Sequence, residues 1–290
     1  MTSMTMTVQS PETKRKSRAA TLARRPGRSL DAYGDQLWFY VRALAWIPRA
    51  VRRYPKEIVR LIADVSFSSG ALTAIGGTVG VMAGLSFFVG TVVGLQSYAA
   101  LDQVGVAALE GFVSAYFNTR VVAPLVAAIA LAATVGSGFT AQLGAMRIAE
   151  EIDAVEVMGI PSLPYLVTTR IIAGTIAVIP LYVLGLMSSY AASRFMVTLF
   201  YGQSVGTYDH YFNLFLLPED VLWSFGKVLV FAVAIIGVHC YQGYYASGGP
   251  AGVGAAVGRA VRTSVTLVVF LDFFLSLAIW GTSTGVKVAG

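Results

Sequence analysis

The sequence predicts an all-α membrane protein, in which an N-terminal interfacial amphipathic helix is followed by five transmembrane helices. Three observations predict this fold class. The 290-residue chain is 56% apolar and only 12% charged, with a mean hydropathy of +0.69, whereas about a quarter of the residues in a soluble domain are charged. Several uncharged runs reach the roughly 20 residues that a helix needs to cross hydrocarbon. The basic residues gather near the N-terminus.

The first 60 residues contain 13 Lys or Arg and 4 Asp or Glu. Because basic segments stay on the cytoplasmic side, we expect a cytoplasmic N-terminus in the plasma membrane. Residues 1–30 are polar and basic and lack the apolar core of a signal peptide. They are predicted to form a disordered basic tail.

Residues 31–64 alternate apolar side chains with arginines. Leu37, Val41 and Leu44 recur at helical spacing beside an aromatic run, a pattern typical of an amphipathic helix in the headgroup plane. A solvated basic linker is the alternative interpretation.

Residues 65–290 are predicted to form the transmembrane domain. Their apolar runs place the five spans at about 70–98, 120–146, 166–193, 225–246 and 259–282. An odd number of spans puts the C-terminus outside. The loops agree, since the two inside loops carry arginines and the two outside loops, near 99–119 and 201–224, carry acids without Lys or Arg.

A short acidic segment, residues 146–160, lies in the first inside loop and is predicted to be a cytoplasmic helix. One narrow face gathers Ile148, Ile152, Val155 and Gly159, and charges occupy the remainder. We expect Arg147 to pair with Glu150 or Glu151. A helix resting on the bilayer is the alternative, but acids facing an anionic leaflet are disfavoured, so docking to a protein partner is the better explanation.

Small and polar residues within the spans suggest further roles. Gly76, Gly80 and Gly84 form a G-x-x-x-G-x-x-x-G pattern that allows close helix packing, although glycine is also simply common in membrane helices. Asp272 lies near the middle of the fifth span, which indicates either a function or pairing with Ser, Thr or backbone of another helix. No metal site is predicted, because His239 and Cys240 have no further ligands nearby in the sequence.

Two other function classes compete. Ser137 and His239 could form the catalytic pair of an intramembrane hydrolase, but the spacing G-S-G differs from the G-x-S-G of such enzymes. A secondary transporter is the other alternative, although inverted repeats are not visible.

The central region resembles a known family. The run A-P-L-V-A-A-I-A-L-A-A-T-V-G-S-G-F-T-A-Q-L-G-A-M-R-I-A-E-E-I-D-A-V-E-V-M-G-I, residues 123–160, is similar to the signature region of the MlaE/YrbE permeases, membrane subunits of ABC transporters that work with MCE-domain proteins. Residues 243–262 and 271–273 also agree with the family. The segment G-Q-S-V-G-T-Y-D-H-Y-F, residues 202–212, looks most like a B-type YrbE subunit of an actinobacterial Mce lipid import system.

The resemblance implies a transport subunit and no enzyme. It implies a heterodimer with a second YrbE-type permease, a dimeric ABC ATPase that binds ATP and Mg, and MCE-domain proteins outside; no nucleic acid and no cofactor bound by this chain are expected. The cargo would be a membrane lipid or another hydrophobic substrate such as a fatty acid, phospholipid or sterol. The sequence has no G-x-x-x-x-G-K-[ST] motif for ATP.

The resemblance also assigns residues to roles. The acidic helix becomes the coupling helix received by the ATPase, through Arg147, Glu150, Glu151, Ile152, Asp153, Val155, Glu156, Met158 and Gly159. The residues themselves, and not the resemblance, place the expected substrate path along spans one, two and five: Phe87, Phe88 and Phe273 suit acyl chains, although aromatics also fill ordinary helix contacts, and Asp272 is an acid within a span. Three charges common in relatives are missing from residues 120–124, 133–137 and 140–142, so a charged headgroup site there would fall to the other subunit.

Overall fold

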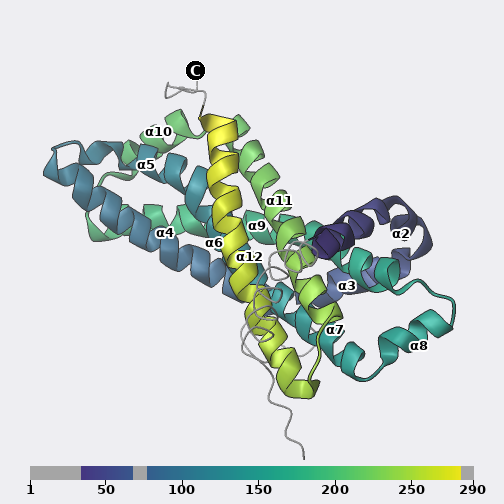
Figure 1. Ribbon diagram of the computed structural model, residues 1–290. Helices are drawn as coiled ribbons and strands as arrows, with labels where there is room; N and C mark the ends of the chain where they lie inside the picture. The colour runs from purple at the N-terminus through teal and green to yellow at the C-terminus, as the bar shows by residue number, and fades with distance from the viewer. Residues whose placement is uncertain (1–33, 68–76, 282–290) are drawn as a thin grey trace, which may run out of the picture. The chain divides into compact units, whose positions relative to one another are not determined.

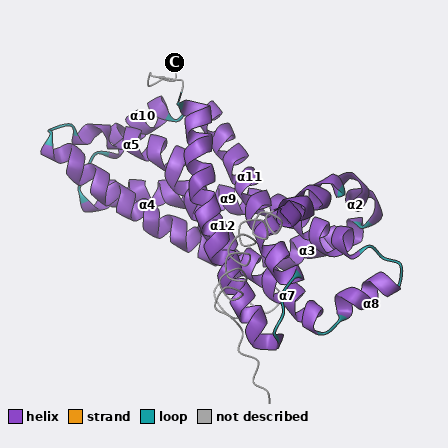
Figure 2. Ribbon diagram, in the orientation of Figure 1, coloured by secondary structure: helices purple, strands orange, loops and turns teal. Residues whose placement is uncertain are grey.

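The computed structural model describes residues 34–67 and 77–281, and helix dominates both stretches (Figure 2). The chain divides into two units, Met1–Ala45 and Trp46–Gly290. In the first unit, residues 34–45 form a helix, and its placement at the membrane interface stays a prediction. The predicted basic tail lies outside the described residues.

Two short helices, α2 (Ile47–Arg53) and α3 (Pro55–Phe67), begin the second unit. Pro55 starts α3, since proline is tolerated in the first turn of a helix. On α3, Ile58 and Leu61 are buried and pack against Ala173 of α9 (Thr169–Phe195). The apolar face of this amphipathic helix is therefore covered by a long helix of the same chain.

Within the described residues, five helical segments are long and apolar enough to cross a membrane, which confirms the predicted number. They are Gly77–Gln103, Ala107–Ile148, Leu163–Phe200, Pro218–Tyr244 and Gly249–Trp280. The predicted limits were too narrow at several ends. The fourth segment begins at 218 rather than 225, and the expected loop 201–224 contains the helix α10 (Val205–Phe215).

The second and third segments are composite. The second joins η1 (Ala107–Leu109), α5 (Glu110–Phe117), η2 (Asn118–Val122), α6 (Ala123–Leu131), η3 (Ala132–Gly136) and α7 (Ser137–Ile148). The third joins η4 (Leu163–Thr168), α9 and η5 (Met196–Phe200). Four of these pieces, η2 to η5, are short π-helical turns, which often lie near functional positions when they interrupt α-helices.

The second, third and fourth segments form the centre of the unit. Half of the most apolar window of each is buried, against 22% for α4 (Gly77–Gln103) and 11% for α12 (Gly249–Trp280). The helices α4 and α12 are therefore peripheral within this chain. Figure 1 shows α5 and α10 together at one end of the unit and α8 (Glu151–Val157) at the other.

Close helix packing occurs further along α4 than Gly76, Gly80 and Gly84 predict. A Cβ atom at Gly90 would lie 2.4 Å from the carbonyl oxygen of Ser189, so α4 and α9 meet backbone to backbone there. A Cβ atom at Gly84 would meet nothing within 4 Å. Gly76 lies outside the described residues, and a role for the three glycines against another chain stays a prediction.

Candidate functional site

The acidic segment contains a helix, α8, but it is shorter than the sequence predicts. The preceding helix ends at Ile148. Glu150 then has a left-handed backbone conformation with φ of 58°, which residues other than glycine rarely adopt. The prediction of one continuous apolar face is therefore wrong, because the break reorients α8. Ile152 is fully buried, whereas Ile148 is 39% exposed.

The acids at the start of α8 remain at the surface. Glu151 and Asp153 lie in its first turn, where they complement the positive end of the helix dipole. Arg147 pairs with Asp153 at 2.8 Å and not with Glu150 or Glu151 as expected, because the break at Glu150 turns α8 back toward it.

The far end of α8 is apolar and exposed. Val157 is 89% and Met158 68% exposed. Gly159 then ends the segment with φ of 77°, a backbone conformation that glycine adopts without strain. Two large apolar side chains held in the open beside an acidic turn are typical of a surface that a partner covers.

A hydrogen-bond cluster connects this end of α8 to α11 (Pro218–Tyr244). The hydroxyl of Ser162 donates to Oε1 of Glu156. The hydroxyl of Tyr244 lies 2.7 Å from that of Ser162 and donates to the same carboxylate at 3.4 Å. These contacts link α8 directly to the end of the fourth segment.

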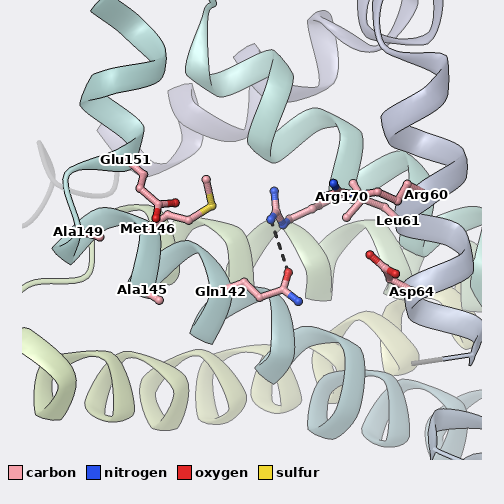
Figure 3. Close-up of a pocket in the computed structure, with 9 residues that line it drawn as sticks. All are labelled: Arg60, Leu61, Asp64, Gln142, Ala145, Met146, Ala149, Glu151 and Arg170. Atoms are coloured by element: carbon pink, nitrogen blue, oxygen red, sulfur yellow. Dashed lines mark hydrogen bonds between the residues drawn. The ribbon is translucent and has the colours of Figure 1, made fainter. Parts of the chain in front are cut away.

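A cavity of about 450 Å³ opens beside α8, between α3, α7 and α9 (Figure 3). It is lined by Arg60, Leu61, Asp64, Gln142, Ala145, Met146, Ala149, Glu151 and Arg170. Arg170, only 6% exposed, donates to the carbonyl of Leu166 at 2.8 Å and reaches Gln142 at 3.5 Å. Sequence reasoning did not identify this site, since its walls come from three separate parts of the chain.

Asp272 is paired with a lysine, at the opposite end of the unit. Its carboxylate lies 2.6 Å from Nζ of Lys227. Lys227 also donates to the carbonyl of Arg120 at 2.8 Å and to Ser276 at 2.9 Å. The sequence-based expectation of a Ser, Thr or backbone partner missed Lys227, although a lysine inside an apolar run is itself a signal that an acid lies near.

A second ion pair lies beside the first. Arg120 donates from Nε and Nη2 to Oδ2 of Asp220 at 3.0 and 2.7 Å. Trp280 donates to the other carboxylate oxygen of Asp220 at 2.8 Å, and the Arg120 guanidinium stacks 4.0 Å from the ring of Tyr116. We call Arg120, Asp220, Lys227 and Asp272 the buried charge cluster. Asp220 was expected in an outside loop, but α11 begins before it and buries it.

The phenylalanines expected on the substrate path lie on the peripheral helices. Phe87 and Phe88 of α4 are 46% and 67% exposed, and Phe273 of α12 is 62% exposed. They face away from the core of this chain, whereas Asp272 points into it. The structure thus separates the predicted aromatic residues from the acid that was grouped with them.

The structure does not join Ser137 to His239. Ser137 donates to the carbonyls of Ala133 and Thr134 in its own helix. The two ring nitrogens of His239 lie 2.8 Å from the hydroxyl of Thr140 and 3.2 Å from that of Ser264. His239 is a buried polar contact between helices, and nothing in this arrangement favours the hydrolase.

Comparison with known proteins supports a transport role. The family model described as Permease MlaE matches residues 67–278. A probable ABC transporter permease protein of Rickettsia bellii is 30% identical over 200 residues, covering 68% of this chain and 76% of that protein. The intermembrane phospholipid transport system permease protein MlaE of Haemophilus influenzae is 28% identical over 195 residues, covering 67% and 75%. The protein TRIGALACTOSYLDIACYLGLYCEROL 1 of Arabidopsis thaliana is 30% identical, covering 66% of this chain and 55% of that protein.

Proposed function

The chain belongs to the MlaE permease family, and from this premise we propose that it is the membrane subunit of an ABC transporter for phospholipids or other hydrophobic lipids. A relative whose name describes intermembrane phospholipid transport supports this cargo class. A separate ATPase would bind ATP and Mg, because an ABC permease works with nucleotide-binding subunits.

The observation that carries this proposal is α8. It joins the second and third spans, presents an acidic first turn and an exposed apolar tip, and is fixed to α11 by the contacts of Glu156, Ser162 and Tyr244. A partner that grips the tip therefore moves two spans and α11 together. We assign α8 and its flanking residues as the coupling element of the ATPase.

The peripheral helices support the second half of the proposal, a pair of permeases. Because α4 and α12 leave most of their apolar surface uncovered within this chain, a second YrbE-type permease and lipid would share that surface. Exposed Phe87, Phe88 and Phe273 would line a path for acyl chains between the two subunits. We further propose an Mce-type assembly with MCE-domain proteins outside, a cytoplasmic N-terminus and an external C-terminus.

Charge reversal on α8 tests the coupling assignment. The double variant Glu151→Lys with Asp153→Lys should lose ATPase association and lipid transport while the permease still accumulates in the membrane, because both acids lie at the exposed start of α8. The control is Asp102→Lys with Glu219→Lys, two reversals of exposed acids near α5 and α10. Association is measured by co-purification of the ATPase in mild detergent.

The result is decisive in either direction. Loss in the α8 variant alone supports the coupling element. Undiminished association in the α8 variant, or equal loss in both variants, would remove α8 from the ATPase interface and with it the observation on which the proposed function rests.

A further inference from the structure

We propose that the cavity between α3, α7, α8 and α9 binds the headgroup of a phospholipid that carries both a phosphate and a primary ammonium, as in phosphatidylethanolamine. This lipid would be a resident ligand at the α8 end of the unit, separate from cargo moving between two permeases. The proposal rests on the size of the cavity, on one buried arginine and on two carboxylates that flank it (Figure 3).

The cavity suits a headgroup in volume and in depth. Its volume of about 450 Å³ falls in the range of small-ligand sites. Arg170 follows the start of the third span, Leu163, by seven residues, so it lies roughly 10 Å along the helix from that end. The headgroup region of a bilayer is about 5 to 8 Å thick on each side, which brings a phosphate within reach of the guanidinium.

Arg170 supplies an incompletely satisfied cation. A guanidinium has five N–H donors. Here one bond, to Leu166, is short, the contact with Gln142 is at the 3.5 Å limit, and Nε has no hydrogen-bond partner among the described residues. Leaving such donors buried and unpaired is unfavourable. A phosphate could accept from two of them at once, which is the geometry that arginine favours.

Two acidic side chains add negative charge to the cavity beside the positive charge of Arg170. Asp64 on α3 and Glu151 on α8 line it on either side of Arg170 (Figure 3). The remaining cation, Arg60, stands at the rim with its side chain 68% exposed and pairs with Glu57 at 3.0 Å. A purely anionic ligand at Arg170 would therefore meet two carboxylates, whereas a zwitterion places its ammonium between them.

The lining also selects the kind of ammonium. A primary ammonium donates three hydrogen bonds, which the carboxylates of Asp64 and Glu151 can accept. A quaternary choline group donates none and is usually held by aromatic rings, and the residues that line this cavity include no aromatic side chain. The geometry therefore favours ethanolamine over choline and over glycerol headgroups.

Lipid binding to the purified full-length chain, without the ATPase, tests the proposal. Delipidated protein in detergent is titrated with phosphatidylethanolamine, phosphatidylcholine or phosphatidylglycerol of identical acyl chains, and bound lipid is counted by native mass spectrometry. We expect one phosphatidylethanolamine site of highest affinity. Removing a charged hydrogen-bond acceptor in Asp64→Asn or Glu151→Gln should weaken that site about tenfold.

Asp102→Asn is the control, because it is also an acid-to-amide change but at an exposed residue that does not line the cavity. It should retain the wild-type affinity. Arg170→Lys keeps the positive charge but removes the planar guanidinium that can donate two hydrogen bonds to one phosphate. It should therefore weaken phosphate binding while preserving the preference for ethanolamine over choline. The affinity for a cargo lipid bound elsewhere should not change in any of the four variants. A change in affinity therefore identifies lipid bound in the cavity.

Three results would overturn the proposal: equal affinity for phosphatidylcholine, tighter binding of phosphatidylglycerol, or affinities unchanged in Asp64→Asn and Glu151→Gln. Because the ATPase is absent from this measurement, the outcome is independent of the coupling test. Failure of either proposal can therefore be recognised without the other.

Discussion

The two ends of the helical unit use charge in different ways. Where α5 and α10 lie, the four members of the buried charge cluster form two ion pairs, and Lys227 is completely enclosed. Where α8 lies, Arg147 and Asp153 form a pair whose side chains are 36% and 59% exposed, and the other acids of the segment remain open at the surface. The charges at the α5 and α10 end are buried and paired, whereas those at the α8 end are exposed to solvent.

The difference teaches what each set of charges can do. Buried pairs that satisfy one another hold η2, α11 and α12 in one arrangement, because separating them would leave an uncompensated charge in a low-dielectric interior. Exposed acids cost little to keep and are available to a partner. We therefore expect rigidity at the α5 and α10 end and exchangeable contacts at the α8 end.

Lys227→Met should give the largest effect on stability. It leaves Asp272 buried without its cation, and the free energy of unfolding should fall by about 3 to 5 kcal/mol. Unfolding in mixed micelles with a denaturing detergent measures this. The double variant Lys227→Met with Asp272→Leu removes both charges and should recover most of the loss. No recovery would show that Lys227 acts through packing and not through the pair.

Asp220→Asn should have the next largest effect, about 2 to 3 kcal/mol by the same measurement. The amide keeps an acceptor for Trp280 but removes the charge that Arg120 contacts through two nitrogen atoms. A loss below about 0.5 kcal/mol would mean that the charge pair between Arg120 and Asp220 contributes little to stability.

Tyr244→Phe should cost about 1 kcal/mol, because it removes one hydroxyl from the cluster with Ser162 and Glu156. Its clearer signature is local: amide hydrogen exchange in α8 should become faster while the buried charge cluster stays protected. Tyr201→Phe, which changes a tyrosine outside this cluster whose hydroxyl donates to the carbonyl of Leu95, is the control and should leave exchange in α8 unchanged. Equal rates of amide hydrogen exchange in α8 of both variants would show that the Tyr244 hydroxyl does not stabilise the contact between α8 and α11.

Arg147→Gln should give the smallest effect, at most about 1 kcal/mol, because solvent screens its exposed pair with Asp153. Raising the salt concentration should reduce even that difference. A loss comparable to that of Lys227→Met would contradict the distinction between the two ends.

Local sequence was sufficient to predict the number of spans, since each depends only on an uncharged apolar run of membrane length. It was also sufficient to find the acidic segment between spans two and three. It failed at Lys227 and Asp220. Their partners, Asp272 and Arg120, lie 45 and 100 residues away along the chain, and no local window contains such a pair.

The sequence by itself determined an all-helical membrane protein with five candidate spans and a charged segment set apart from them, because hydropathy and charge act on each stretch of chain independently. Only the tertiary structure decided that Glu150 breaks the acidic helix, that Gly90 rather than Gly84 brings α4 onto α9, and that Arg170 lies between two acids in a cavity. These features depend on which helices pack together, and packing is a property of the whole fold.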